Sequence, residues 1–235
     1  MQTQNAQSAL IFDLDGVIID NTDFHVEAWV AYARKLGRAL TADDVKMRLG
    51  YSCKEYMRFI LDREPTDAEV ADSVAGKESL YREIYRPHLR ATDGLIALLD
   101  AATKAGIPMG IATGAPQENI DFTLDGLGIR HYFAQVTDSS QVPHCKPAPD
   151  TYLLAASRLG IAPEHCVVLE DAIAGIQSGK SAGMKVIAIT TSYPADILRQ
   201  HSAPDAVIES FTDLQQPDCP ALAALREICG AQFTV

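Results

Sequence analysis

The sequence is short of positive charge. It contains 20 lysines and arginines against 31 aspartates and glutamates, so its formal net charge at pH 7 is -11. An acidic surface repels the phosphate backbone of nucleic acids and the head groups of anionic membranes. We therefore expect no nucleic-acid and no membrane partner, although a small phosphate ester can still bind where local cations outweigh the overall charge.

Cysteine is also scarce, and long apolar runs are missing. The five cysteines are odd in number and form no C-x-x-C pair, which indicates neither a disulfide framework nor a zinc site. No segment reaches the ~18 apolar residues that a membrane span needs. The first seven residues lack the basic and apolar parts of a secretory signal. We expect a cytoplasmic protein and, by default, a monomer.

What the sequence does contain is a regular alternation of short apolar runs with amphipathic stretches. Helical patterns lie near 93–105, 116–127, 150–159, 172–182 and 194–201. The apolar runs between and around them are Leu10–Phe12, Met109–Ala112, Phe133–Val136, Val167–Leu169, Val186–Ile189 and Ala206–Ile208. This alternation predicts the α/β class, with a doubly wound parallel sheet.

The stretch from 20 to 90 breaks the alternation. It contains helical patterns near 22–36, 42–48, 53–63 and 67–86 and no clear strand. We therefore predict a core domain made of residues 1–19 and 91–235, with a helical cap domain of residues 20–90 inserted after the first strand. An insertion at this point can act as a lid over a site. The tail from 217 to 235 is predicted to be helical and then frayed.

Polar residues follow four of the predicted strands. The first strand ends in Asp13 and Asp15, two carboxylates that repel each other at pH 7 unless a cation or a shared proton relieves them. Thr113-Gly114, Lys146 and Glu170-Asp171 follow later strands. The carboxyl ends of parallel strands share one edge of a sheet, where ligands bind. Each residue alone has a structural explanation, such as a helix cap or a solvated loop, but the combination predicts a functional site.

The motifs Asp13-Leu14-Asp15-Gly16, Thr113-Gly114, Lys146-Pro147-Ala148-Pro149 and Glu170-Asp171 resemble, in this order and spacing, those of the haloacid dehalogenase (HAD) superfamily. The resemblance spans about residues 8–215. The insertion after the first strand is similar to the branch that contains β-phosphoglucomutase and many sugar phosphatases. The resemblance implies a Rossmann-like core and a Mg²⁺-dependent enzyme that acts on a small phosphorylated metabolite.

The resemblance also implies catalytic and metal-binding roles. Asp13 would be the nucleophile that forms an aspartyl-phosphate. Asp15 would be the general acid and then the general base. Mg²⁺ would take oxygens from Asp13, from the backbone carbonyl of Asp15 and from Asp171, with Glu170 close by or bound directly.

The remaining core motifs would hold the phosphoryl group. Thr113 and the backbone N–H of Gly114 would bind phosphate oxygens, and Lys146 would neutralise developing charge and brace the nucleophile. Gly16 is expected to leave room for the phosphate, since a side chain there would obstruct it.

In the inserted region we predict substrate contacts from His25, Gly50, Ser52 and Lys54. The mutase branch has a histidine at the position of His25, where it couples cap closure to the acid/base aspartate. Cys53 falls where the mutase has the arginine that grips the distal phosphate of its bisphosphate intermediate.

A mutase must hold that intermediate while it reorients, whereas hydrolysis needs less binding. We therefore predict a phosphohydrolase that acts on a small phosphate monoester, a sugar or polyol phosphate. The alternative is β-phosphoglucomutase, and a minor alternative is a non-catalytic binding module on the same fold.

Overall fold

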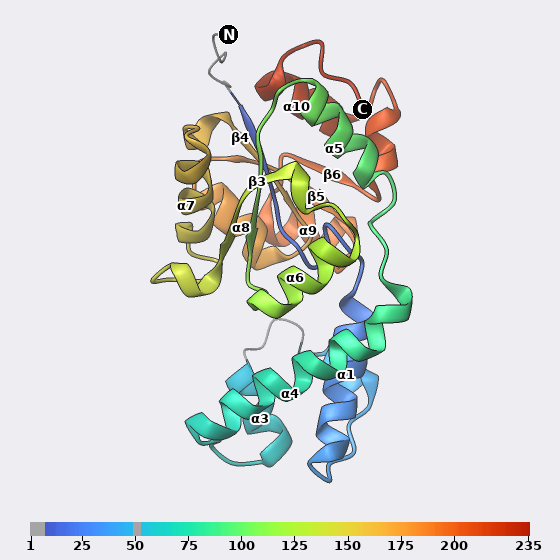
Figure 1. Cartoon of the computed structure of the whole chain (residues 1–235), viewed down its shortest axis with the longest axis vertical. Coiled ribbons are helices and arrows are strands. Elements are labelled where there is room, and N and C mark those ends of the chain that lie inside the picture. The colour runs from blue at the N-terminus through green and yellow to red at the C-terminus, as the bar shows by residue number, and fades with distance from the viewer. Residues whose placement is uncertain (1–7, 49–52) are drawn as a thin grey trace. The chain divides into compact units, whose positions relative to one another are not determined.

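The structure is a computed structural model that describes residues 8–48 and 53–235 (Figure 1). Its contacts divide the chain into two compact units. One unit contains the chain up to Asp20 and from Arg90 onward, and the other is Asn21–Leu89. Among the described residues, no helix is long and apolar enough to span a membrane.

The first unit is built on a parallel sheet. Its strands are β1 (Ala9–Phe12), β2 (Met109–Thr113), β3 (Phe133–Asp138), β4 (Cys166–Glu170), β5 (Lys185–Ile189) and β6 (Ala206–Ile208). They lie in the order β3-β2-β1-β4-β5-β6, and every neighbouring pair is parallel. The predicted doubly wound parallel α/β fold is confirmed.

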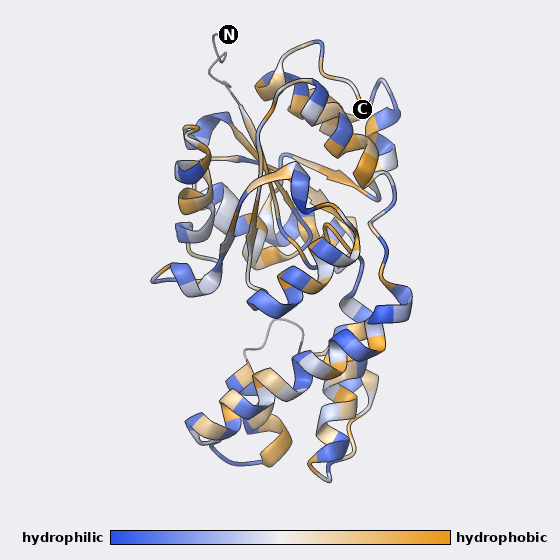
Figure 2. Cartoon of the chain, in the orientation of Figure 1, coloured by the Kyte–Doolittle hydropathy of each residue, from blue (hydrophilic) through white to orange (hydrophobic). Residues whose placement is uncertain are grey.

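Burial explains why these segments form strands. β1, β2 and β4 are buried at every residue, as strands covered by helices on both faces must be. The central strands are accordingly hydrophobic, whereas the helices mix hydrophobic and hydrophilic residues (Figure 2). The helices of this unit are α5 (Leu95–Lys104), α6 (Gln117–Gly126), α7 (Asp150–Leu159), α8 (Ile173–Ser181), α9 (Ala195–Ser202) and α10 (Pro220–Cys229).

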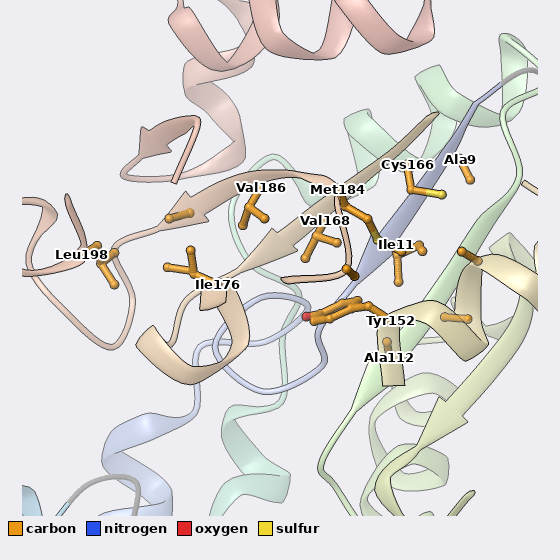
Figure 3. Close-up of a cluster of buried hydrophobic side chains, with 14 residues drawn as sticks. Ala9, Ile11, Ala112, Tyr152, Cys166, Val168, Ile176, Met184, Val186 and Leu198 are labelled. Carbon is orange, nitrogen blue, oxygen red and sulfur yellow. The ribbon is translucent and has the colours of Figure 1, made fainter. Parts of the chain in front are cut away.

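One apolar cluster fixes α7, α8 and α9 to the sheet. It joins Ile11, Val168 and Val186 of the strands to Tyr152 of α7 and Ile176 of α8 (Figure 3). Because Tyr152 is fully buried in this cluster, its ring anchors α7, the helix that follows the Lys146 loop. α10 packs beside β4, β5 and β6.

The prediction of a frayed tail is wrong. After α10, Phe233 is buried, and its carbonyl accepts a hydrogen bond from Arg226 Nε at 3.0 Å. The sequence offers a single large apolar side chain in this segment, and its burial is what fixes the last residues.

The second unit contains α1 (Thr22–Lys35), α2 (Ala42–Lys46), α3 (Cys53–Leu61) and α4 (Asp67–Tyr85), and its described residues include no strand. Thr41 and Thr66 form capping boxes that begin α2 and α4. The Trp29 and Tyr56 rings stack at 4.3 Å within its apolar cluster. Short 3₁₀ helices in the two units are Arg86–His88, Arg130–Tyr132, Ser139–Gln141, Pro163–His165 and Phe211–Gln215.

Candidate active site

The first unit brings carboxylates from β1 and β4 together. Asp13 directly follows β1, and its N–H donates to the Leu169 carbonyl of β4 at 3.0 Å. Glu170 ends β4 and Asp171 follows it. One carboxylate oxygen from each of Asp13, Glu170 and Asp171 lies within 4.8 Å of the others.

Lys146 reaches this cluster from the loop before α7. Its Nζ lies 3.1 Å from Asp13 Oδ1 and 2.7 Å from Glu170 Oε1. It also lies 4.8 Å from the centre of the Tyr152 ring, within the range of a cation–π contact. Burial alone would lower the pKa of Lys146, but Asp13 and Glu170 raise it above its ordinary value, so the side chain stays an ammonium.

Glu170 is the anchor of the cluster. Its Oε1 accepts from Lys146 and from the Tyr152 hydroxyl at 3.0 Å. Its Oε2 accepts from the N–H groups of Asp171 and Ala172, at 2.8 and 2.9 Å. These four donors compensate a carboxylate that has no exposed surface.

The cluster carries more negative charge than Lys146 can neutralise. Burial first, and then repulsion by Glu170 and Asp15, raises the pKa of Asp13 to about 7 against the opposing effect of Lys146. Burial, Glu170 and Asp13 likewise raise the pKa of Asp171 well above its usual value. Asp13 Oδ1 is buried and receives no well-directed hydrogen bond from the described residues.

Crowded carboxylate oxygens with uncompensated charge suit a hard divalent cation such as Mg²⁺. The residues present therefore fit the metal that the sequence predicts.

The side chain of Asp15 is not part of the carboxylate cluster, although its charge acts on Asp13. The prediction that Asp15 contributes a backbone carbonyl, and its carboxyl group as acid and base, stays a prediction.

The phosphate loop predicted after β2 is also at this edge of the sheet. Thr113 ends β2 and is buried, and its Oγ1 accepts from the Ala115 N–H at 3.0 Å. An oxygen that accepts in this way still has its own O–H to donate. Gly114 is exposed, and a Cβ there would meet no atom within 4 Å, so the surroundings of its backbone are open.

Gly16 and Gly175 leave space for the carboxylates. Gly16 has φ +73°, and a Cβ there would lie 1.9 Å from Asp171 Oδ2. A Cβ at Gly175 would lie 1.6 Å from Glu170 Oε1. Among the described residues, the contact that requires Gly16 is thus with Asp171, and its predicted contact with phosphate stays a prediction.

The second unit holds His25 in a partly buried polar network. Lys77 Nζ lies 2.7 Å from His25 Nδ1 and 2.9 Å from Glu78 Oε1. The His25 ring stacks on Tyr81 at 3.9 Å, and Asn21 Nδ2 donates to the Tyr81 hydroxyl at 2.6 Å. His25 therefore has a fixed position within this unit.

The cations beside residues 49–52 have partners within the second unit. Lys54 pairs with Glu64 at 3.1 Å. The Arg48 guanidinium lies 3.6 Å from the Phe59 ring centre and donates to the Asp44 carbonyl. The predicted substrate contacts Gly50 and Ser52 lie outside the described residues.

Four residues of the site were not predicted from the sequence: Tyr152, Gly175, Thr191 and Ser192. Thr191 Oγ1 donates to the Gly16 carbonyl at 2.5 Å, and Ser192 Oγ donates to Asp171 Oδ2. Gly175 stands five positions after Glu170. A glycine inside a helical pattern indicates a close packing contact, and this was the sequence signal that could have pointed to Gly175. The other three had no sequence signal, because their partners are distant along the chain.

Comparison with known proteins shows to which enzyme family the chain belongs. The family model of the haloacid dehalogenase-like hydrolases matches residues 7–183. The chain belongs to this family of enzymes, and the predicted membership is confirmed.

Two of the relatives are named as phosphatases. Hexitol phosphatase A of Escherichia coli (strain K12) is 34% identical over 224 residues, covering 88% of this chain and 94% of that protein. The fructose-1-phosphate phosphatase YqaB of the same organism is 32% identical over 185 residues, covering 77% of this chain and 95% of that protein.

Two solved structures share the fold. A HAD hydrolase, family IA, variant 3, from Entamoeba histolytica has a TM-score of 0.85 and 30% identity, covering 92% of this chain and 99% of that chain. β-Phosphoglucomutase from Clostridium difficile has a TM-score of 0.78 and 25% identity, covering 95% and 97%. The predicted likeness to sugar phosphatases and β-phosphoglucomutases is confirmed.

Proposed function

We propose that this protein is a Mg²⁺-dependent phosphohydrolase that cleaves a sugar or polyol phosphate monoester through an aspartyl-phosphate. The observation that carries the proposal is the position of Lys146, 3.1 Å from Asp13 and 2.7 Å from Glu170. One ammonium between two carboxylates favours the ionised form of the Asp13 nucleophile and holds its side chain in place. The relatives named as hexitol and fructose-1-phosphate phosphatases support the substrate class.

The reaction has two displacements. A carboxylate oxygen of Asp13 attacks phosphorus, the P–O bond to the substrate alcohol breaks, and Asp15 gives its proton to the leaving oxygen. Asp15 then removes a proton from water, which attacks the aspartyl-phosphate, releases inorganic phosphate and restores Asp13. Thr113 and the Gly114 N–H donate to phosphoryl oxygens, and Lys146 offsets the charge that develops on them.

The metal would be held by Asp13, Asp171 and the backbone carbonyl of Asp15, beside the anchored Glu170. When bound, Mg²⁺ supplies charge neutralisation for the cluster and for the phosphoryl oxygens.

The second unit favours hydrolysis over a mutase reaction. A mutase needs a cation that grips a distal phosphate, and Cys53 stands at the position where an arginine would serve. The neighbouring cations Arg48 and Lys54 contact Phe59 and Glu64, respectively. We also propose that the second unit is a cap that contacts the substrate.

The test is phosphate release from a panel that contains fructose 1-phosphate, hexitol phosphates and β-glucose 1-phosphate. We expect release from sugar or polyol phosphates that requires Mg²⁺ and stops in EDTA. Incubation of β-glucose 1-phosphate with a trace of the 1,6-bisphosphate distinguishes a hydrolase from the alternative, a mutase. Glucose 6-phosphate formed without free phosphate would contradict the hydrolase and favour the mutase.

A further inference from the structure

Two consecutive residues after β5 reach different loops of the site. Thr191 Oγ1 donates to the backbone carbonyl of Gly16 at 2.5 Å, across 175 positions of sequence. Its neighbour Ser192 donates through Oγ to Asp171 Oδ2. The mechanism proposed above uses neither hydroxyl.

The two loops that these hydroxyls hold are already in contact with each other. Gly16 lies so close to Asp171 that a Cβ would be 1.9 Å from Oδ2 and 2.3 Å from the carboxyl carbon. Oδ2 of Asp171 is therefore enclosed by the Gly16 backbone on one side and the Ser192 hydroxyl on another. Thr191 fixes the Gly16 side of this enclosure, and Ser192 fixes the carboxylate itself.

This arrangement restricts how Asp171 can rotate. A buried carboxylate with one oxygen hydrogen-bonded and packed against backbone has its plane set before any ligand arrives. Mg²⁺ requires near-ideal octahedral geometry at short distances, whereas Ca²⁺ accepts longer and more variable ligand positions. A ligand held in place therefore matters more for Mg²⁺ than for Ca²⁺.

We propose that Thr191 and Ser192 are positioning residues that hold Asp171 in the orientation required by Mg²⁺ and so favour Mg²⁺ over Ca²⁺. This inference rests on the proposed function, because it assumes that Asp171 is a metal ligand. Neither residue touches the substrate or the metal in this account. Their effect is transmitted through the Asp171 carboxylate and the Gly16 backbone.

The test is titration calorimetry of the full chain with Mg²⁺ alone and with Ca²⁺ alone. Ser192→Ala removes the donor, and we expect its Kd for Mg²⁺ to rise roughly 10- to 100-fold, the range typical of lost ligand-supporting partners. We expect a smaller rise for Ca²⁺ and recovery in Ser192→Thr. Thr191→Val keeps the side-chain shape and should shift the Kd for Mg²⁺ in the same direction.

Ser140→Ala is the matched control, since Ser140 Oγ also donates to a carboxylate, Asp138 Oδ1, outside the metal cluster. Its Kd for Mg²⁺ should equal that of the unaltered protein. Wild-type Mg²⁺ binding by both Ser192→Ala and Thr191→Val, or equal weakening by Ser140→Ala, would overturn this inference alone. No Mg²⁺ binding by the unaltered protein would overturn the metal assignment as well.

Discussion

Gly16 illustrates how a single hydrogen in place of a side chain shapes this site. Gly16→Ala would place a Cβ 1.9 Å from Asp171 Oδ2 and would also force alanine to adopt φ +73°. The left-handed backbone alone costs about 1–2 kcal/mol. We expect at least that loss of stability together with a fall in phosphate release of roughly 100-fold or more, because the displaced Asp171 no longer lies correctly beside Asp13 and Glu170.

Gly183→Ala separates the effect of backbone strain on stability from the effect of a displaced Asp171 on activity. Gly183 has φ +77°, but a Cβ there would meet nothing within 4 Å. Urea unfolding should therefore show a loss of about 1–2 kcal/mol for Gly183→Ala and a larger loss for Gly16→Ala, while phosphate release stays normal for Gly183→Ala. Normal release by Gly16→Ala would refute the role assigned to this contact.

Tyr152 is a second residue whose hydroxyl can be tested alone. Burial, Glu170 and Asp13 raise its pKa well above the usual value, so the hydroxyl stays a donor to Glu170. Tyr152→Phe should lower the free energy of unfolding by about 1.5–3 kcal/mol, as expected for a lost hydrogen bond to a charged group. The measurement is urea denaturation in metal-free buffer.

Tyr132→Phe is the comparison, because Tyr132 donates to Asp100 at 2.6 Å near the surface. Water can replace that bond, so its loss should cost less than about 1 kcal/mol. Equal effects of the two substitutions would argue against a special role for the Tyr152–Glu170 bond.

Among the elements, Asp205 links α8 to β5. Its Oδ2 accepts from Lys180 Nζ at 2.8 Å and from the Val186 N–H at 2.7 Å. Burial alone would raise the pKa of Asp205, but these two hydrogen bonds lower it below its ordinary value of 3.8. Its stabilisation is therefore complete above that value and is lost as the pH falls through the lower folded-state pKa.

We expect Asp205→Ala to destabilise the protein by about 1–3 kcal/mol at pH 7, since Val186 N–H loses its side-chain acceptor. The difference from the unaltered protein should shrink below about pH 4. Unfolding curves at several pH values measure it, with the exposed Asp218→Ala as a control. A difference that grows in acid would contradict the sign of this linkage.

The elements themselves were largely predictable from the sequence. Buried parallel strands are apolar at successive residues, so each of β1 to β6 was predicted to within two residues at either end. β3 extends further than predicted, to Asp138, because Thr137 and Asp138 pair with Ala112 and Thr113. Polar residues at a strand end carry no apolar signal, so this extension depends on the neighbouring strand.

The candidate site was predictable only where its residues lie in motifs. Asp13, Lys146 and Asp171 follow strands in a recognisable order, and the fold brings them together. Tyr152 and Ser192 were missed because they act on residues 18 and 21 positions away. Such contacts follow from the packing of α7 and the course of the chain after β5, which no local pattern encodes.

Across the whole molecule, a net charge of -11 stands against a proposed site that must accept a phosphate anion. Lys146 alone does not reverse the charge of the carboxylate cluster, so the proposed function requires the metal and the substrate to bind together. In the proposed function, the chemistry depends on one covalent step, the transfer of the phosphoryl group to Asp13.

That step can be observed directly. The protein is mixed with a hydrolysed substrate and Mg²⁺, quenched in acid within one turnover, digested and analysed by mass spectrometry. We predict one added phosphoryl group on the peptide that contains Asp13, and its absence in Asp13→Asn. A phosphoryl group on a different residue, or full phosphate release by Asp13→Asn, would contradict it.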